Sequence, residues 1–399
     1  MVLLNQIKNL IELSLNFILS INFIIILAIF ILLYHILKYF VIDRKHIKAL
    51  KESREPKLVT IEDLKEIPLT NIIIPAWKEG EIFEGCLLSI VKLTYPNLKI
   101  IVNAGGSEET INIANSFKKY DNFTILYQTA GEGKIKAIND CLKHTSEGII
   151  YFIDADMYLT DEIFFWMLYL IINENKEIVA SLYRPDESIE SIDIVKYAFF
   201  NRYEPFFKSI VTNRKDQISA HTCMKYTVIK SVGKLTEKRS FDDNSSISLD
   251  LYSKGYTVYR SSKMVQSFTY PKKVIEYMNQ NLRWVENAQF FNLKNNKFRF
   301  FKFFLIFLIS IYMFISPFLL FLNIYFFLFG ILILLSYYLK KIRKVIFYKL
   351  NNKKDSICLN FKFFIKLIYY IYVDALVVII AFFEILFYRK AYKKRKNLI

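Results

Sequence analysis

The sequence GIIYFIDADM, residues 148–157, is the stretch from which the fold can be predicted. Its apolar and aromatic run over 149–153 predicts a strand that is buried on both faces, as in a parallel sheet covered by helices. Asp154 and Asp156 follow that run directly. Because alternate side chains of an extended segment point to the same side, both carboxylates should face one small volume at the carboxyl end of the strand. Open α/β sheets bind their ligands at that edge.

Two neighbouring carboxylates are a suitable donor set for a hard divalent cation. Mg²⁺ or Mn²⁺ held by one or two carboxylates usually completes its coordination shell with substrate phosphates. The alternative is that Asp-x-Asp only closes the strand and caps the helix after it. From these residues alone, both interpretations remain open.

The composition indicates a membrane protein with room for one sizeable soluble domain. The chain has 399 residues, of which 54% are hydrophobic and 17% aromatic. Its cysteines have no Cys-x-x-Cys spacing, which argues against a zinc site or a disulfide framework and fits a reducing interior. They are Cys86, Cys141, Cys223 and Cys358.

The positive charge of the chain is concentrated beside its membrane segments. The formal net charge is +17, and residues 340–399 contain 15 Lys or Arg against three acids. Anionic lipid explains this distribution better than nucleic acid does, so no nucleic-acid partner is expected.

The N-terminal part predicts a membrane anchor, residues 1–42, followed by a cytosolic linker, residues 43–68. Residues 13–37 are uncharged over 25 positions, which is long enough to span a bilayer. Basic residues cluster after this run, which predicts that the following domain is cytoplasmic and that the protein is integral to the plasma membrane.

The C-terminal part predicts an interfacial segment over 291–302 and two transmembrane helices over 303–339, with Pro317 and Asn323 bracketing the hairpin. A basic segment, 340–366, a third membrane helix, 367–388, and a basic tail, 389–399, follow. The basic clusters on both sides of the third helix conflict with a single crossing, so that helix is either re-entrant or interfacial, or the charge rule fails there.

The last membrane helix contains Asp374 and Glu384. Charges at that depth are costly, so both should face protein or a water-filled path. Such a path could be the exit route of a polymer, and helix-to-helix hydrogen bonding is the alternative.

Between residues 69 and 153, short apolar runs alternate with helical stretches. Strands are expected over 71–75, 98–102, 124–127 and 149–153, and helices over 82–93 and 109–119. The predicted fold class is α/β, a doubly wound and mostly parallel sheet. Glycines at 105, 106, 131 and 133 follow strands, where they would either let backbone N–H groups approach a phosphate beside Lys134 or form ordinary turns.

Six segments together resemble the membrane-embedded family-2 glycosyltransferases, which include the cellulose, chitin, hyaluronan and poly-N-acetylglucosamine synthases. They are IIIPAWKE (72–79), NAGGS (103–107), GKIKAIN (133–139), DAD (154–156), Asp242-Asp243 and QNLRW (280–284). The resemblance implies a GT-A domain over 69–290, flanked by transmembrane helices.

The resemblance also implies site roles. Asp154 and Asp156 would hold the metal, and Asp243, beside Asp242, would be the catalytic base. The donor would contact Pro75, Glu79, Asn103, Gly105, Lys134, Asp154 and Ala155. Gln280, Arg283, Trp284 and His221 would contact the acceptor or the diphosphate.

Structural alternatives exist for several of these residues. Asp242, Asp243 and Asn244 also suit a helix N-terminus. Arg283 and Trp284 also suit a membrane-surface helix, and His221 also suits a buried structural role.

Two departures from the family pattern concern the donor site and the base. Asn103-Ala104 stands where many relatives have two aspartates, which removes charge near the nucleoside. Asp243 lies one residue from the usual position, which an ungapped alignment would give to Asn244; we assign the base to Asp243 because an amide cannot accept the proton.

The resemblance therefore implies an inverting, metal-dependent enzyme that transfers a sugar from a nucleotide diphosphate sugar, expected to be a UDP-sugar, to a growing β-linked polysaccharide at the cytoplasmic face. One alternative is transfer of a single sugar to a polyprenyl phosphate or glycolipid. Another is a catalytically inactive subunit of a polysaccharide-export complex. The implied partners are the nucleotide-sugar donor, a polysaccharide or lipid-linked acceptor, the bilayer and an accessory subunit.

Overall fold

The computed structural model describes residues 20–45, 58–185, 218–237, 242–267, 273–351 and 360–387, together with residues 6, 48 and 271. The chain divides into two compact units. The first, the membrane unit, contains residues 1–52, 196–204 and 274–388, and the second, the sheet unit, contains residues 53–195, 205–273 and 389–399. Residues 49–57 of the predicted linker, all of the tail 389–399 and Cys358 lie outside the described residues.

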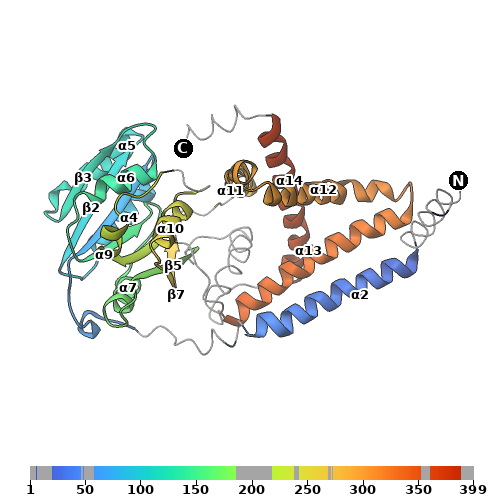
Figure 1. Ribbon diagram of the computed structural model, residues 1–399, viewed down its shortest axis with the longest axis horizontal. Coiled ribbons are helices and arrows are strands. Elements are labelled where there is room, and N and C mark those ends of the chain that lie inside the picture. Colours follow the sequence, from blue (N-terminus) through green and yellow to red (C-terminus); the bar gives the residue numbers. More distant parts are fainter. Residues whose placement is uncertain are drawn as a thin grey trace. The chain divides into compact units, whose positions relative to one another are not determined.

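The sheet unit is built on a seven-stranded sheet with the strand order β3-β2-β1-β4-β6-β5-β7 (Figure 1). β1 pairs in parallel with both β2 and β4, whereas β6 is antiparallel to β4 and β5. The strands are β1 Thr70–Trp77, β2 Leu98–Gly105, β3 Phe123–Gln128, β4 Ile149–Ile153, β5 Ile178–Pro185, β6 His221–Lys225 and β7 Tyr259–Ser267.

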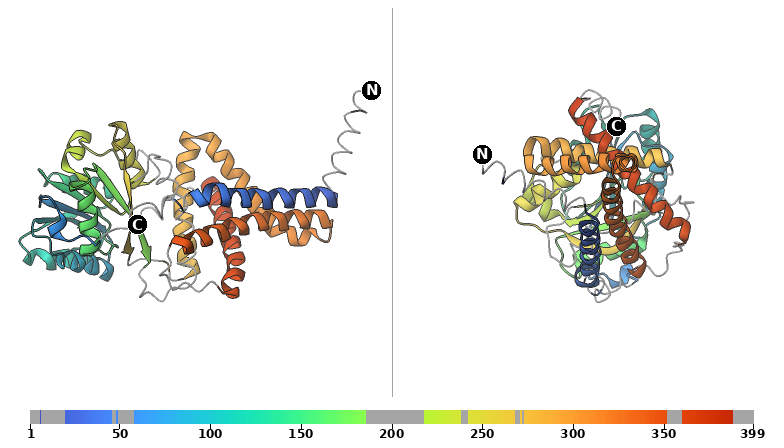
Figure 2. Two further views of the ribbon diagram at one scale, coloured as in Figure 1. Left: turned by 90° about the horizontal axis from the view of Figure 1, so that it is seen from below. Right: turned by 90° about the vertical axis from the view of Figure 1, so that its right-hand side faces the viewer.

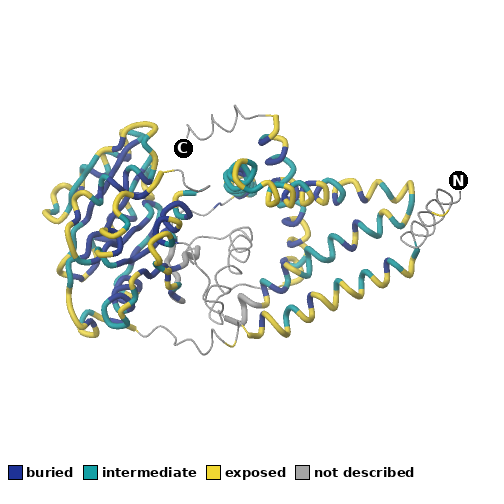
Figure 3. The backbone as a smooth tube through the Cα atoms, viewed as in Figure 1, coloured by how far each residue is buried: buried dark blue, intermediate teal, exposed yellow. Residues whose placement is uncertain are grey.

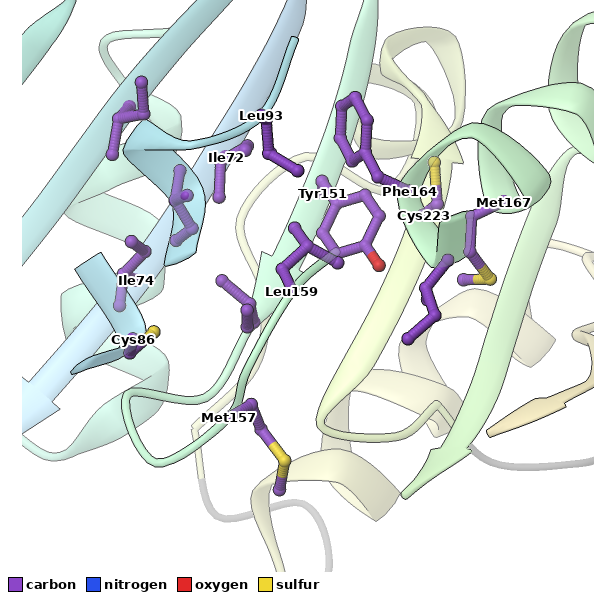
Figure 4. Packing of buried hydrophobic residues seen from close by; sticks show 14 of the residues in the cluster. Ile72, Ile74, Cys86, Leu93, Tyr151, Met157, Leu159, Phe164, Met167 and Cys223 are labelled. Carbon is purple, nitrogen blue, oxygen red and sulfur yellow. The ribbon is translucent and has the colours of Figure 1, made fainter. Parts of the chain in front are cut away.

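Helices cover both faces of this sheet, as the apolar strands require. Alternate residues of β1 enter different cores, so that Ile72 and Ile74 pack on one face and Ile73 on the other. Figure 4 shows the first of these cores around Tyr151 and Phe164. The helices of the sheet unit are α4 Glu81–Val91, α5 Glu108–Ser116, α6 Lys134–Leu142, α7 Asp161–Ile172, α9 Tyr226–Val232 and α10 Asp243–Ser253.

The predicted α/β fold class is confirmed, and so is the central strand, which is β4 with the predicted ends. β2 is longer than expected because it continues through Asn103 and Ala104 to Gly105, pairing with β3 along this extension. Asn103 is therefore a strand residue and not part of a loop.

The sheet has its topological switch point between β1 and β4. From β1 the chain adds β2 and β3 on one side, and it then returns to place β4 on the other side. The β1–β4 ladder ends at the pair Ile73 and Phe152, so the two strands separate beyond it. Pro75, which has no N–H to donate, lies just past this last pair. A crevice at the carboxyl ends of such strands is the expected ligand site of an open α/β sheet.

The membrane unit contains four helices that are long and apolar enough to cross a bilayer. Many of their large apolar side chains are exposed, as lipid-facing residues are, and Figure 3 shows exposed residues along α2 and α12. The helices of the unit are α2 Ile21–Leu37, α11 Val274–Asn295, α12 Lys297–Leu319, α13 Ile324–Asn351 and α14 Phe361–Phe387.

These helices differ in extent from the predicted segments. α12 and α13 form the expected hairpin, whose turn falls at residues 320–323, but α13 continues to Asn351 through the basic segment. Lys and Arg are good helix formers and can extend their charged ends from an apolar surface, so basic residues need not end a helix. α11, which carries the QNLRW segment, belongs to the membrane unit and not to the predicted domain 69–290.

Helices α2 and α13 run in the same direction. The rings of Phe23 and Phe329 lie 6.0 Å apart, and farther along the Arg343 guanidinium donates to both oxygens of the Asp43 carboxylate, at 2.7 and 3.1 Å. Asp43 and Arg343 are each 8% exposed. α14, by contrast, crosses this pair at a steep angle in every view (Figures 1 and 2).

Candidate active site

Asp154 and Asp156 lie at the carboxyl end of β4, at the switch point of the sheet. Residues 154–157 form a turn in which the Met157 N–H donates to the Asp154 carbonyl at 3.1 Å, so the expected extended alternation is wrong. Asp154 and Asp156 are nevertheless both partly exposed at this strand end, and the charges of both act on Glu79. The backbone N–H of Asp154 donates to the carbonyl of Ala220 at 3.0 Å, which fixes the strand end against β6.

Lys134 lies beside Asp154 because of where α6 begins. Gly133 has a φ of 78°, which favours glycine, and the helix starts at the next residue. The Lys134 Nζ is 2.5 Å from Asp154 Oδ1, and the two side chains are 29% and 30% exposed. This ion pair was not predicted from the sequence, although both residues follow sheet strands and therefore share an edge.

Asp243 comes close to the same lysine from a distant part of the chain. Burial lowers the pKa of Lys134, but the charges of Asp154, Asp243 and Asp156 outweigh it and raise that pKa. Of these three carboxylates, Asp154 makes the ion pair with Lys134, while Asp156 and Asp243 act on the ammonium group through their charge. The structure thus brings together residues from the end of β4, the start of α6 and the start of α10.

The neighbouring Asp242 is the N-cap of α10. Its Oδ1 accepts from the Ser245 N–H at 2.6 Å, and its Oδ2 accepts from the Ser245 hydroxyl at 2.7 Å. Asp243 is the first helical residue and is exposed. The cap that the sequence offered as an alternative is therefore formed by Asp242, and the catalytic role of Asp243 remains a prediction. Ser240 and Phe241 of the same segment lie outside the described residues.

Glu79 follows β1 at the opposite side of the switch point. Its pKa is raised to about 7, first by burial and then by the negative charges of Asp156 and Asp154. A carboxyl whose ionisation is opposed by two other carboxylates indicates a surplus of negative charge at this edge.

That surplus fits a divalent cation. Oxygen ligands are the ones that Mg²⁺ and Mn²⁺ prefer, and Asp154 and Asp156 supply them. Within the described ranges, no group of three or more His, Cys, Asp or Glu side chains could hold a metal ion by itself.

Asn103, predicted to contact the donor, is 2% exposed on β2. Its amide nitrogen donates to the carbonyl of Ala137 at 3.3 Å, which fixes the amide orientation, because a carbonyl can only accept. Gly105 has a packing role, since a Cβ there would lie 2.4 Å from the carbonyl oxygen of Gln128. Donor contacts by Pro75, Asn103, Gly105 and Ala155 remain predictions.

His221 occupies a structural environment. It is 1% exposed, and burial lowers its pKa to about 3, so the imidazole is neutral. Its Nδ1 lies 3.2 Å from the Tyr151 hydroxyl. This agrees with the structural alternative, and acceptor binding by His221 remains a prediction.

Gln280, Arg283 and Trp284 lie on α11 of the membrane unit. Arg283 is exposed, and Gln280 and Trp284 are partly exposed. Their roles in binding acceptor or diphosphate remain predictions.

Comparisons with known proteins agree with this fold and site. Residues 71–231 match the family described as Glycosyl transferase family 2. The chain is 28% identical over 151 residues to the poly-beta-1,6-N-acetyl-D-glucosamine synthase of Staphylococcus epidermidis, covering 37% of this chain and 35% of that protein. It is 24% identical over 268 residues to the probable glycosyltransferase YdaM of Bacillus subtilis, covering 60% of this chain and 62% of that protein.

Among solved structures, the mannosyltransferase PcManGT of Pyrobaculum calidifontis, in complex with GDP-Man and Mn²⁺, has a TM-score of 0.54 and 13% identity. That similarity covers 91% of this chain and 99% of that one. The protein thus contains a family-2 glycosyltransferase domain with the GT-A fold, accompanied by helices suited to a membrane. The chain matches less than two thirds of the length of either curated relative, and Asp243 lies beyond the matched family residues.

Proposed function

We propose that this protein is an inverting, metal-dependent glycosyltransferase that transfers sugar from a UDP-sugar to a growing β-linked polysaccharide at the cytoplasmic face of the plasma membrane. The observation that supports the proposal is the ion pair of Lys134 with Asp154 at the switch point of the sheet, where the charges of Asp156 and Asp243 also act on Lys134. The similarity of the domain to a polysaccharide synthase supports the choice of product.

In this reaction Asp243 accepts the proton of the attacking acceptor hydroxyl. The hydroxyl oxygen forms a bond to the anomeric carbon, while the bond from that carbon to the diphosphate oxygen breaks and the nucleoside diphosphate leaves. In-line attack from the opposite face inverts the anomeric centre.

Asp154 and Asp156 would hold the divalent cation, which when bound stabilises the charge of the departing diphosphate. Lys134 adds a positive charge beside the same phosphates, and the exposed Arg283 could pair with them in a bidentate manner. Trp284 offers a flat apolar face on which an acceptor sugar could stack.

The proposed orientation follows from the basic residues. Those after residue 37, those at the C-terminal end of α13 and those of the tail should all be cytoplasmic. The steep crossing of α14 supports a topology in which α2, α12 and α13 span the bilayer and α14 lies along its cytoplasmic surface. Labelling of single cysteines near residues 355 and 395 in intact cells tests this topology, because both sites should be protected.

The direct test is sugar transfer by the full chain, purified in detergent or nanodiscs, with UDP-sugars, GDP-mannose and Mn²⁺ or Mg²⁺. A polymer or a ladder of products is the expected result. Products with one added sugar on lipid would replace the proposal with single transfer to a lipid acceptor. No transfer from any donor would support an inactive subunit instead.

A further inference from the structure

A polar cluster of Tyr277, Lys341 and Asp374 joins the helix α11 to two other helices of the membrane unit. The Tyr277 hydroxyl donates to Asp374 Oδ1 at 2.8 Å, and Lys341 Nζ donates to Asp374 Oδ2 at 2.8 Å. The three residues come from α11, α13 and α14 respectively. Asp374 therefore forms helix-to-helix bonds, which was the second of the two roles that the sequence left open.

This cluster is well protected. Tyr277 is 1% exposed, and the side chains of Lys341 and Asp374 are 10% and 33% exposed. A tyrosine hydroxyl that donates to a carboxylate makes a stronger bond than it would to a neutral group. The Lys341 ammonium group supplies an opposite charge beside the Asp374 carboxylate.

Apolar packing continues the contact along both helices. Leu282 of α11 belongs to the same buried cluster as Val377, Ala381 and Ile385 of α14. These α14 residues recur at helical spacing after Asp374, so one stripe of α14 faces α11. Apolar side chains permit a helix to rotate or slide, whereas a hydrogen bond between two defined atoms does not.

The position of Tyr277 on α11 bears on the QNLRW segment. Arg283 is six residues farther along, which is about 240° around the helix at 3.6 residues per turn. Tyr277 is thus on the packed side, while Arg283 and Asn279 are exposed. Fixing the Tyr277 hydroxyl fixes the rotation of α11 and, with it, the direction in which Arg283 points.

We propose that Asp374 is a positioning residue for sugar transfer, which acts by holding the Tyr277 hydroxyl and thereby orienting Arg283. The role rests on the proposed function, since it assumes that Arg283 contacts the diphosphate during transfer. It gives a role in sugar transfer to Asp374, which lies 91 positions after Arg283 in the sequence.

The test separates the hydroxyl bond from the ion pair. Lys341→Met/Asp374→Asn removes both charges but retains an acceptor for Tyr277, whereas Lys341→Met/Asp374→Leu removes both charges and the acceptor. At saturating donor, the first double variant should transfer sugar within about threefold of the wild type. The second, and Tyr277→Phe, should be slower by roughly tenfold or more, as expected for a lost hydrogen bond to a polar or charged group.

UDP should still bind with Mn²⁺ in all of these variants, because Asp154 and Asp156, the proposed metal ligands, are unchanged; this binding shows that the sheet unit is folded. Tyr369→Phe, which removes an exposed hydroxyl from α14, is the matched control and should behave as the wild type does. If Tyr277→Phe does not fold, the two double variants decide the question. Equal rates in both double variants, or a wild-type rate in a folded Tyr277→Phe protein, would overturn the proposal.

A labelling experiment tests the orientation of α11 without reference to activity. Leu282→Cys places a thiol at a position that is 6% exposed, and its reaction with a water-soluble maleimide should be several-fold faster when Tyr277→Phe is added. An unchanged labelling rate would contradict the inference. If the wild type transfers no sugar while labelling does accelerate, the proposed function fails but the positioning of α11 by Asp374 stands.

Discussion

Carboxylates gather in two regions of this chain, and the two regions balance their charges differently. In the membrane unit, Asp43 pairs with Arg343 and Asp374 pairs with Lys341, so these two acids each have a basic partner in the helix bundle. At the edge of the sheet, Asp154, Asp156 and Asp243 act together on Lys134, and Glu79 resists ionisation beside them. Balanced pairs hold helices together, whereas surplus acid creates a site for a cation and its phosphates.

The largest effect is expected when the proposed base at the edge of the sheet is removed. Asp243→Asn cannot accept the acceptor proton, and sugar transfer should fall roughly a thousandfold, as for the loss of a general base. Nucleotide binding should persist, because Asp243 is not assigned to the metal. Transfer assays and UDP binding on the same preparation check both points, and Asn244→Ala is the companion variant. If the Asn244 variant loses transfer and the Asp243 variant keeps it, the base was assigned one residue too early.

The second variant leaves a buried acid of the membrane unit without its basic partner. Arg343→Met leaves the Asp43 carboxylate buried without its guanidinium, which should cost about 3–5 kcal/mol of stability. The thermal midpoint of the full chain in detergent should fall accordingly and should largely recover in Asp43→Leu/Arg343→Met. Lys362→Met, an exposed basic residue of α14, is the control. A midpoint for Arg343→Met equal to that of the control would show that this pair does not hold α2 to α13.

The third variant removes a proposed metal ligand. Asp156→Asn should weaken UDP binding in the presence of Mn²⁺ on the order of a hundredfold, because the cation contributes several kcal/mol. Asp121→Asn, an exposed acid elsewhere in the sheet unit, should leave binding unchanged. Equal losses in the two variants would indicate a general charge effect and not a metal site.

The smallest effect concerns the pH dependence of stability. Between pH 4.5 and about 7, folded Glu79 retains a proton that the unfolded chain has released. The free energy of unfolding therefore falls as pH rises through this window. Glu79→Gln should remove this contribution. As pH rises through the window, the thermal midpoint of this variant should fall less than that of the wild type, and the two decreases should differ by roughly a few degrees. Glu66→Gln, at an exposed position, should retain the wild-type slope.

Much of the sheet unit could be predicted from the sequence because its signals are local. The apolar run at 149–153 predicted β4 and the position of Asp154 and Asp156 at its carboxyl end, but it did not predict the turn over 154–157. The pairing of Lys134 with Asp154 could not be predicted, because it depends on the register of strands and helices that lie apart in sequence.

The membrane unit was less predictable for a physical reason. Apolarity alone predicted its helices, but it does not specify direction or packing. The contacts of Asp374 with Tyr277 and Lys341 join residues 97 and 33 positions apart. The cost of an isolated charge required some partner for Asp374, but it could not identify which one.

The central claim is that surplus negative charge at the switch point binds a divalent cation together with a nucleotide. The most direct test is calorimetric titration of UDP into the full chain, once with Mn²⁺ and once with a chelator. The titration is made at roughly pH 6.5 in two buffers of different ionisation enthalpy, so that the number of protons released on binding can be measured. We predict binding only with the cation, accompanied by proton release from Glu79 as the added charge lowers its pKa. Equal affinity in the chelator, or no nucleotide binding under either condition, would contradict the account.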